Sequence, residues 1–280
     1  MNRAFSLVVL LLVLGGCAAN LPPLRSAVHD GSVEPIPASA PVTIGDSLPT
    51  ETSFSIENSM RVFPRGPDRP AATFDMAFAG EQRIVPRPGG YDLLATITGS
   101  RIISDRRMNA ESERNMANIA DCLRDLEVRL QLDQHRRLVP DSLQIDGIPV
   151  AADASGSEDP LPDAMLALFD SLATQTARQP GLELATGDTL VSVSFLLPDS
   201  SEVSVIEVVD GRVTHAGRDA VLFQIDVEVP PDFPLAAAGY SVVDIETGVV
   251  LASRHSLAHV VNAIGTETLT TTSHAIANPD

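Results

Sequence analysis

The 280-residue chain contains no lysine and no tryptophan, and aromatic residues make up only 4% of it. Its 19 basic residues are therefore all arginine, against 37 acidic residues, and the formal net charge is −18. Because a phosphate backbone is bound mainly by clustered Lys and Arg, this balance argues against a nucleic-acid partner. The shortage of aromatic rings also argues against a stacking platform for bases or sugars.

The acidic charge is concentrated in the second half of the sequence. Residues 141–280 contain 21 acidic residues and four arginines, a net charge of 4 − 21 = −17. Surfaces of this kind keep proteins soluble and apart from one another. With neither a lysine nor a G-x-G sequence in the chain, we expect no phosphate-binding loop and no cofactor.

The N-terminus is MNRAFSLVVLLLVLGGC, in which one arginine precedes an apolar run at 7–14. This run is shorter than the roughly 20 apolar residues that a membrane-spanning helix needs. We therefore predict that residues 1–16 are a secretory signal peptide.

The segment Leu14-Gly15-Gly16-Cys17 resembles the lipobox of bacterial lipoproteins. The resemblance implies that Cys17 carries a diacylglyceryl group and becomes the acylated N-terminus after cleavage of the signal. The protein would bind the membrane through these acyl chains, since two or three chains make a stable anchor. In the Gram-negative pattern, Ala18 after the cysteine favours the periplasmic leaflet of the outer membrane.

Cysteine occurs only at Cys17 and Cys122. With the first lipidated, no intramolecular disulfide can form. Cys122 lies on an apolar stripe between Ile119 and Leu126, and we expect a buried, unreactive thiol there.

Residues 17–49 are rich in proline and in small or polar residues and show no sustained hydrophobic period. This composition is typical of a flexible tether. We therefore place the globular domain at 50–276, with a polar stretch at 151–160 as a possible internal boundary.

The dominant period of the domain is two. Apolar residues alternate with polar or small ones at 74–78, 126–133 and 221–229. Such alternation predicts antiparallel strands with one buried and one solvated face. Four dipeptides predict turns between strands: Asp146-Gly147, Asp210-Gly211, Ala216-Gly217 and Thr247-Gly248.

Two segments show helical spacing instead. The first, about 163–177, begins after Pro162 and ends at Pro180-Gly181, and the second spans about 110–124. Strands on either side of helices predict an α+β fold: a mainly antiparallel sheet, curved or split, with one or two helices packed on a face. In architecture alone, this resembles the open half-barrels of some periplasmic lipoproteins.

Gly45-Asp46-Ser47-Leu48 matches the first block of GDSL-type esterases, in which the serine is the nucleophile. The block lies in the expected tether, and no histidine in the chain has an aspartate three residues before it, as that family requires. No G-x-S-x-G sequence occurs either. We therefore predict no catalytic residue.

A metal site is not expected. His255 and His259 are four residues apart and His274 could approach them, but no H-E-x-x-H sequence accompanies them, and we expect them on a polar face. Asp226, Glu228 and Asp232 lack the spacing of an EF-hand loop. Arg136-Arg137 is predicted to form the turn of a hairpin.

Three functions remain open. The sequence favours a non-enzymatic envelope lipoprotein that acts in binding, assembly or structure. The first alternative is a carrier of lipid or other hydrophobic cargo in a cleft between sheet and helices, and the second is a hydrolase. A carrier needs a continuous apolar cavity and should copurify with lipid, whereas an enzyme needs polar groups that converge in a pocket.

Overall fold

The computed structural model describes residues 30–47, 51–64, 72–104, 124–137, 139, 142–145, 148–149, 178–196, 202–228, 235–261 and 266–277. Within these ranges the regular structure is all β-strand and contains no helix. The predicted α+β class is therefore wrong, because the described segments keep the period of two. The predicted antiparallel sheet is confirmed. The helix expected at 163–177 lies outside the described residues, as does nearly all of that expected at 110–124.

The strands fall into two sets along the sequence. The first set is β1 (Asp30–Glu34), β2 (Val42–Thr43), β3 (Thr52–Pro64), β4 (Ala72–Arg87), β5 (Gly90–Ser104), β6 (Glu127–Asp133), β7 (Gln144–Ile145) and β8 (Ile148–Pro149). The second set is β9 (Glu183–Leu184), β10 (Thr189–Leu196), β11 (Glu202–His215), β12 (Arg218–Glu228), β13 (Leu235–Asp244), β14 (Val250–Val261) and β15 (Thr266–Ala277).

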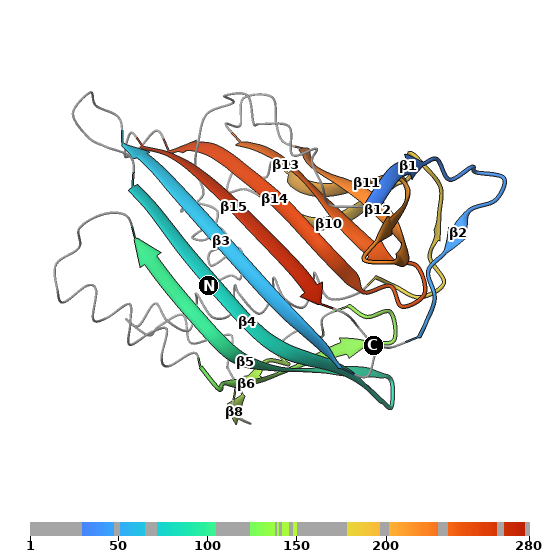
Figure 1. The fold of residues 1–280 in the computed structure, drawn as a ribbon, viewed down its shortest axis with the longest axis horizontal. Coiled ribbons are helices and arrows are strands. Elements are labelled where there is room, and N and C mark those ends of the chain that lie inside the picture. Colours follow the sequence, from blue (N-terminus) through green and yellow to red (C-terminus); the bar gives the residue numbers. More distant parts are fainter. Residues whose placement is uncertain are drawn as a thin grey trace.

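The two sets join into one 13-stranded antiparallel sheet (Figure 1). Its order is β1-β11-β12-β13-β14-β15-β3-β4-β5-β6-β7-β8, and β10 also pairs with β11. The last strand, β15, lies between β14 and β3, with partners from Thr266↔Pro64 to Ala277↔Ser53. The C-terminal strand therefore joins the two halves of the chain. Strands β2 and β9 form a separate two-stranded sheet.

Register defines a common face across this sheet, because successive residues of a strand alternate between its two faces. We call the face that carries Phe54, Leu93, Leu130 and Phe223 the inner face, and the opposite one the outer face. Strand β6 alternates fully, with Val128, Leu130 and Leu132 buried on the inner face. In this part of the sheet the predicted division into one buried and one solvated face is confirmed.

The core on the inner face has two parts. The first lies on β3 to β6 and contains Phe54, Ile56, Ile84, Leu93, Ala95, Ile97, Val128, Leu130, Leu132, Leu143 and Val249. The second lies against β11 to β14 and contains Ile36, Ile44, Leu184, Ala185, Val209, Val221, Phe223, Val243 and Val250.

A third cluster lies on the outer face of β11 to β14. It contains Val213, Ala220, Leu222, Val242, Leu251 and Ala252, with Val33 of β1 and Tyr240 packed against it. The consecutive residues Ala220 to Phe223 are therefore all buried. At this point strand β12 has two buried faces, and the predicted solvated face is absent.

The sheet curves strongly, as Figure 1 shows, with β10 to β12 behind the broad surface of β14, β15 and β3. The loop after β6 is five strands away from the β13–β14 turn, about 24 Å in a flat sheet. Yet the Arg136 guanidinium of that loop donates a hydrogen bond to the Thr247 carbonyl in the turn. The inner face is therefore concave, and its two sides meet at this end.

The described part of the expected tether is folded. Strand β1 pairs with β11, and the Ile36 and Ile44 side chains are buried in the second part of the core. Gly45 donates its N–H to the Ile245 carbonyl at 2.7 Å. The prediction of a flexible tether is therefore wrong for residues 30–47, because their few apolar side chains pack onto the domain. The preceding residues, 17–29, lie outside the description.

The turn predictions have mixed outcomes. Ala216-Gly217 forms the β11–β12 turn and Gly248 lies in the β13–β14 turn, both glycines with positive φ. The turn predicted at Asp210-Gly211 is wrong, because this dipeptide lies inside β11 at a β-bulge. A Cβ atom at Gly211 would lie 2.5 Å from the Glu34 carbonyl oxygen, so glycine is needed there for the close approach of β1.

Candidate functional site

The inner face has an unusual distribution of charge. On β13, β14, β15, β3, β4, β5 and β6, every Asp, Glu and Arg lies at an outer register position: Glu57, Arg61, Asp75, Glu81, Arg83, Arg87, Asp92, Arg101, Glu127, Arg129, Asp133, Asp244, Arg254 and Glu267. The inner positions of these adjacent strands carry no such residue. The sheet therefore presents a wide concave face without acidic or arginine side chains.

Beyond these seven strands, the described residues form two ion pairs at the inner positions of β11 and β12: an exposed pair between Arg212 and Asp219, and a buried pair that includes Glu207 of β11. The Arg178 guanidinium lies 2.5 Å from Glu207 Oε1, and the Ser241 hydroxyl of β13 donates to the same carboxylate oxygen at 3.2 Å. Arg178 also lies over the Phe223 ring, 5.8 Å from its centre. Both charged side chains are largely buried, so each needs the other to offset the loss of hydration.

Arg136 closes one end of the concave face. Its guanidinium donates to three backbone carbonyls, those of Thr247, Arg178 and Asp46, the last at 3.1 Å. It also lies 5.7 Å from the centre of the Tyr91 ring. Burial lowers the pKa of Arg136. The residue fastens the β6 side of the sheet, the β13–β14 turn and the N-terminal segment to one another.

The outer face contains a cavity of about 480 Å³ over β4, β5 and β6. Its charged lining residues are Glu51, Glu81, Arg83, Glu127 and Arg129. Neither Ser, Cys nor His is among the residues that line it. The cavity is a polar hollow whose lining residues include no Ser–His or Cys–His pair.

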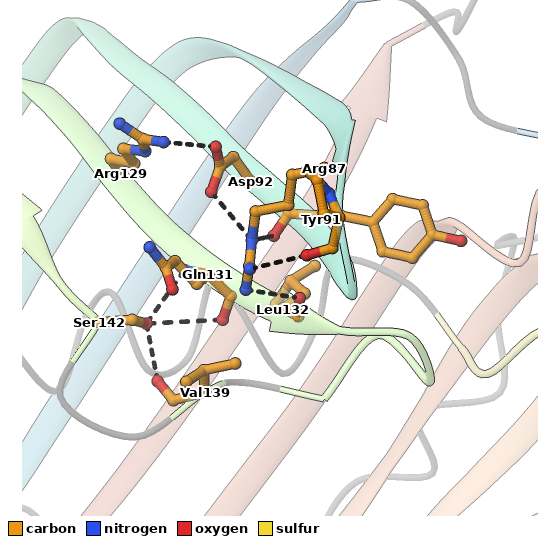
Figure 2. A network of polar contacts seen from close by, with 9 residues as sticks. Arg87, Tyr91, Asp92, Arg129, Gln131, Leu132, Val139 and Ser142 are labelled. Atoms are coloured by element: carbon orange, nitrogen blue, oxygen red, sulfur yellow. Dashed lines mark hydrogen bonds and ion pairs between the residues drawn. The ribbon is translucent and has the colours of Figure 1, made fainter.

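A polar network beside this cavity ties the hairpins together (Figure 2). Asp92 lies 2.5 Å from an Arg129 nitrogen and 3.4 Å from Arg87 Nε. Arg87 also donates to the carbonyls of Tyr91 and Leu132. Arg129 is therefore already paired with a carboxylate, and Arg87 links β4 to β5 and β6.

The residues of the esterase-like block are held in a structural role. Ile44, just before the block, is buried; within the block, the Asp46 carbonyl accepts a hydrogen bond from Arg136, and Ser47 is exposed. A Cβ atom at Gly45 would lie 2.1 Å from the Glu246 carbonyl oxygen. The glycine of the block is thus explained by packing against the β13–β14 turn. Leu48 lies outside the described residues.

The other predicted site residues are placed only in part. Cys17 and Cys122 lie outside the described residues. Register places His274 opposite Ser253 and His255 opposite Thr272, both at inner positions. Asp226 is exposed on β12. Among the described residues, no group of three or more His, Cys, Asp or Glu side chains could hold a metal ion, and no helix could cross a membrane.

Sequence reasoning missed the two buried arginine sites. Arg136 does lie in a turn after β6, as predicted, and its backbone N–H donates to the Asp133 carbonyl. The Arg136 guanidinium, however, is buried in the protein. Glu207 gave a usable signal, because it interrupts the apolar positions Val205 and Val209. A charge in an apolar register predicts a buried partner of opposite sign.

Comparisons with known proteins give no family. No family model and no curated protein matches the chain. One similar solved structure is lipovitellin, described for its lipid–protein interactions, with a TM-score of 0.47 and 8% identity over 83% of this chain. The chain spans only 25% of the lipovitellin chain.

Two bacterial structures are also similar. A LolA superfamily protein of Nitrosomonas europaea has 12% identity and a TM-score of 0.20, covering 81% of this chain and 86% of its own. An outer-membrane lipoprotein-sorting protein domain of Vibrio parahaemolyticus has 10% identity and a TM-score of 0.20, covering 83% and 88%. At these identities and TM-scores the likenesses carry no argument about function.

Proposed function

We propose that this protein is a non-enzymatic carrier that binds apolar cargo, such as a lipid, on the concave inner face of its sheet. The observation that carries the proposal is the absence of Asp, Glu and Arg from the inner positions of seven adjacent strands. Uncharged concave surfaces are where apolar ligands lose most contact with water. The outer face of the same strands carries all the charge and stays compatible with solvent.

The inner face is longer than the described core requires. The closed end is filled by Ile36, Ile44 and Leu184 against β11 to β14, and by Phe54 and its neighbours on β3 to β6. Beyond Ile56, the inner positions of β3 stay uncharged for six more residues, or about 20 Å at the rise of a strand. That stretch supplies the surface on which cargo would lie.

Binding of cargo at the inner face is tested by comparing the wild type with two arginine substitutions on β14. Leu257 is at an inner register position and Ser256, beside it, is at an outer one. We expect lipid to copurify with the wild type and with Ser256→Arg. Leu257→Arg should retain at least about tenfold less, because an unpaired charge is costly in an apolar site.

Lipid in the organic extract is measured by mass spectrometry, and thermal melts establish that each variant is folded. Nile red, an uncharged apolar dye, gives a second measurement on delipidated protein. Saturable dye binding that is lost only in Leu257→Arg supports the proposal. A wild type that yields no lipid and binds no dye refutes it, whatever the variants do.

The carrier would act at a membrane surface through its N-terminus. We propose that Cys17 is lipidated and holds the protein in the cell envelope, on the periplasmic face of the outer membrane. The support is the Leu14 to Cys17 segment and the signal-like residues before it. Intact-mass analysis of membrane-extracted protein should show cleavage before Cys17 and added acyl groups, both absent in Cys17→Ser. An unmodified Cys17 in the mature wild type would contradict the anchor.

A further inference from the structure

The cavity on the outer face of β4, β5 and β6 carries charges that the proposed carrier function does not use. Its volume of about 480 Å³ is in the usual range for small-molecule sites. One row of paired residues along it, the acidic row, is Glu81, Thr96 and Glu127. The next row, the arginine row, is Arg83, Leu94 and Arg129. Carboxylates and guanidinium groups therefore start from backbone positions about 7 Å apart along the strands.

The two arginines of this cavity differ in what they bind. Arg129 lies 2.5 Å from an Asp92 oxygen, as Figure 2 shows. Arg83 is exposed and has no hydrogen bond or ion pair with any described residue. A guanidinium presents a planar fork of N–H donors that matches two oxygens of a phosphate or a carboxylate. Arg83 is therefore the group of the cavity that is available to an anion.

Two carboxylates lie close to Arg83 in the fold and are also available. Glu81 is two residues before it on the same face of β4, and Glu51 directly precedes Thr52, which pairs with Gln82. Both carboxylates are exposed, and neither forms an ion pair with Arg83 or with any other described residue. The space between these groups can therefore hold a molecule that contacts the guanidinium with one end and a carboxylate with the other.

The remaining lining residues narrow the class of ligand. Leu94 and Thr96 are half-buried between the charged side chains, and no aromatic residue lines the cavity. A quaternary ammonium group is recognised mainly by aromatic rings, so this cavity is a poor site for one. A primary ammonium group instead donates up to three hydrogen bonds, which carboxylates accept.

We propose that this cavity binds a small zwitterion, in which a primary ammonium group lies a few bonds from a phosphate or a carboxylate. The anionic group contacts Arg83, and the ammonium group contacts Glu81 and Glu51. The site lies on the face of the sheet opposite the inner face, so it does not depend on the proposed carrier function. Aminophospholipid head groups and short peptides both have this chemistry, and the test separates these two sources.

The test is a titration of the purified mature protein in which NMR follows the backbone amide signals. Glycerophosphoethanolamine represents the head group and dialanine the peptide, whereas ethanolamine and glycerol 3-phosphate lack the anionic and the ammonium group, respectively. We expect a zwitterion to shift the signals of residues 81–83, 94–96 and 127–129 until they saturate, and the tighter of the two identifies the source. Ethanolamine and glycerol 3-phosphate should each bind at least about tenfold more weakly, because each makes only part of the contacts.

Neighbouring outer positions provide matched controls. Arg83→Gln and Glu81→Gln should each weaken binding of the zwitterion about three- to tenfold, because each removes one charged partner from an open site. Arg101→Gln and Glu57→Gln remove the same charges from outer positions of β5 and β3 that do not line the cavity, and they should have no effect. All four side chains are exposed, so each variant should melt as the wild type does.

Weakening by Arg83→Gln and Glu81→Gln alone supports the site. Equal weakening by Arg83→Gln and Arg101→Gln would show a general effect of charge and overturn the inference. Binding of ethanolamine or glycerol 3-phosphate as tight as that of the zwitterions would also overturn it. Signal shifts that do not saturate with either zwitterion, or that lie outside the cavity, would do the same. Binding of lipid and Nile red is measured separately, so the carrier function can fail or hold independently of this result.

Discussion

The two halves of the sheet, β3 to β6 and β11 to β14, differ in how their strands are buried. On β3 to β6, inner residues such as Phe54 are buried and outer ones such as Ser55 are exposed. On β12, Ala220 to Phe223 are buried on both faces. The same alternating sequence pattern is therefore found in β3 to β6, where one face is buried, and in β12, where both faces are buried.

The difference follows from what packs over each side. Residues 30–47 and the β2–β9 pair add Ile36, Ile44 and Leu184 to the inner side of β11 to β14, and Val33 of β1 packs on the outer side. The segment 30–47 and the β2–β9 pair therefore form a second layer over the inner face of β11 to β14, whereas β1 is a strand of the main sheet. Strands β13 and β14 continue from this layered part along the charge-free inner face.

The largest effect is expected at the centre of the layered side. Phe223 is fully buried, so Phe223→Ala should lower the free energy of unfolding by about 3–5 kcal/mol through lost burial and a cavity. Its exposed neighbour Gln224 provides the control, and Gln224→Ala should stay within about 0.5 kcal/mol of the wild type. Urea melts give both values. Similar losses for both variants would show that Phe223 and Gln224 do not lie on opposite faces of β12, and that the assignment is wrong.

An intermediate effect tests the contrast between the two sides directly. Leu222 and Leu94 both lie on the outer face, but Leu222 is buried in the third cluster and Leu94 is half-buried at the cavity. Leu222→Ala should cost about 2–5 kcal/mol, and Leu94→Ala about 1 kcal/mol. Equal costs in urea melts would mean that the outer face is covered to the same degree on both sides.

The parts of the fold that depend on neighbouring residues were predictable from the sequence. The alternation at 126–133 and 221–229 predicted strands, and β6 and β12 occupy those places. The positive-φ turns at Gly217 and Gly248 were predictable for the same reason. Each of these features is decided within about ten residues of sequence.

Features that depend on distant parts of the chain were not predictable. The proline-rich composition of 30–47 gives no sign that Ile36 and Ile44 enter a core formed by β11 to β14. The dipeptide at 210–211 has turn chemistry, and only the crossing of β1 explains why it forms a bulge. The burial of Arg136 depends on the curvature of the whole sheet.

The candidate site was predictable only in outline. A single charge in an apolar register, Glu207, marks the inner face of β11, but the charge-free face appears only when seven strands are aligned by register. Strand order joins β15 to β3, which are separated by about two hundred residues of sequence. No local pattern contains that pairing.

The smallest effect is expected at Ser47, in the segment that adds a layer to β11 to β14. Gly45→Ala places a Cβ atom against the Glu246 carbonyl and should cost about 1–3 kcal/mol, because backbone on both sides would have to move. Ser47 is exposed two residues later, so Ser47→Ala should change stability by less than about 0.5 kcal/mol.

A serine nucleophile also needs a base at a fixed distance, and no histidine of the chain follows an aspartate at the spacing of the esterase family. Neither the wild type nor Ser47→Ala should therefore hydrolyse p-nitrophenyl butyrate above a buffer blank. Hydrolysis by the wild type that disappears in Ser47→Ala would make this segment a catalytic element, and the proposal of a non-enzymatic carrier would be wrong.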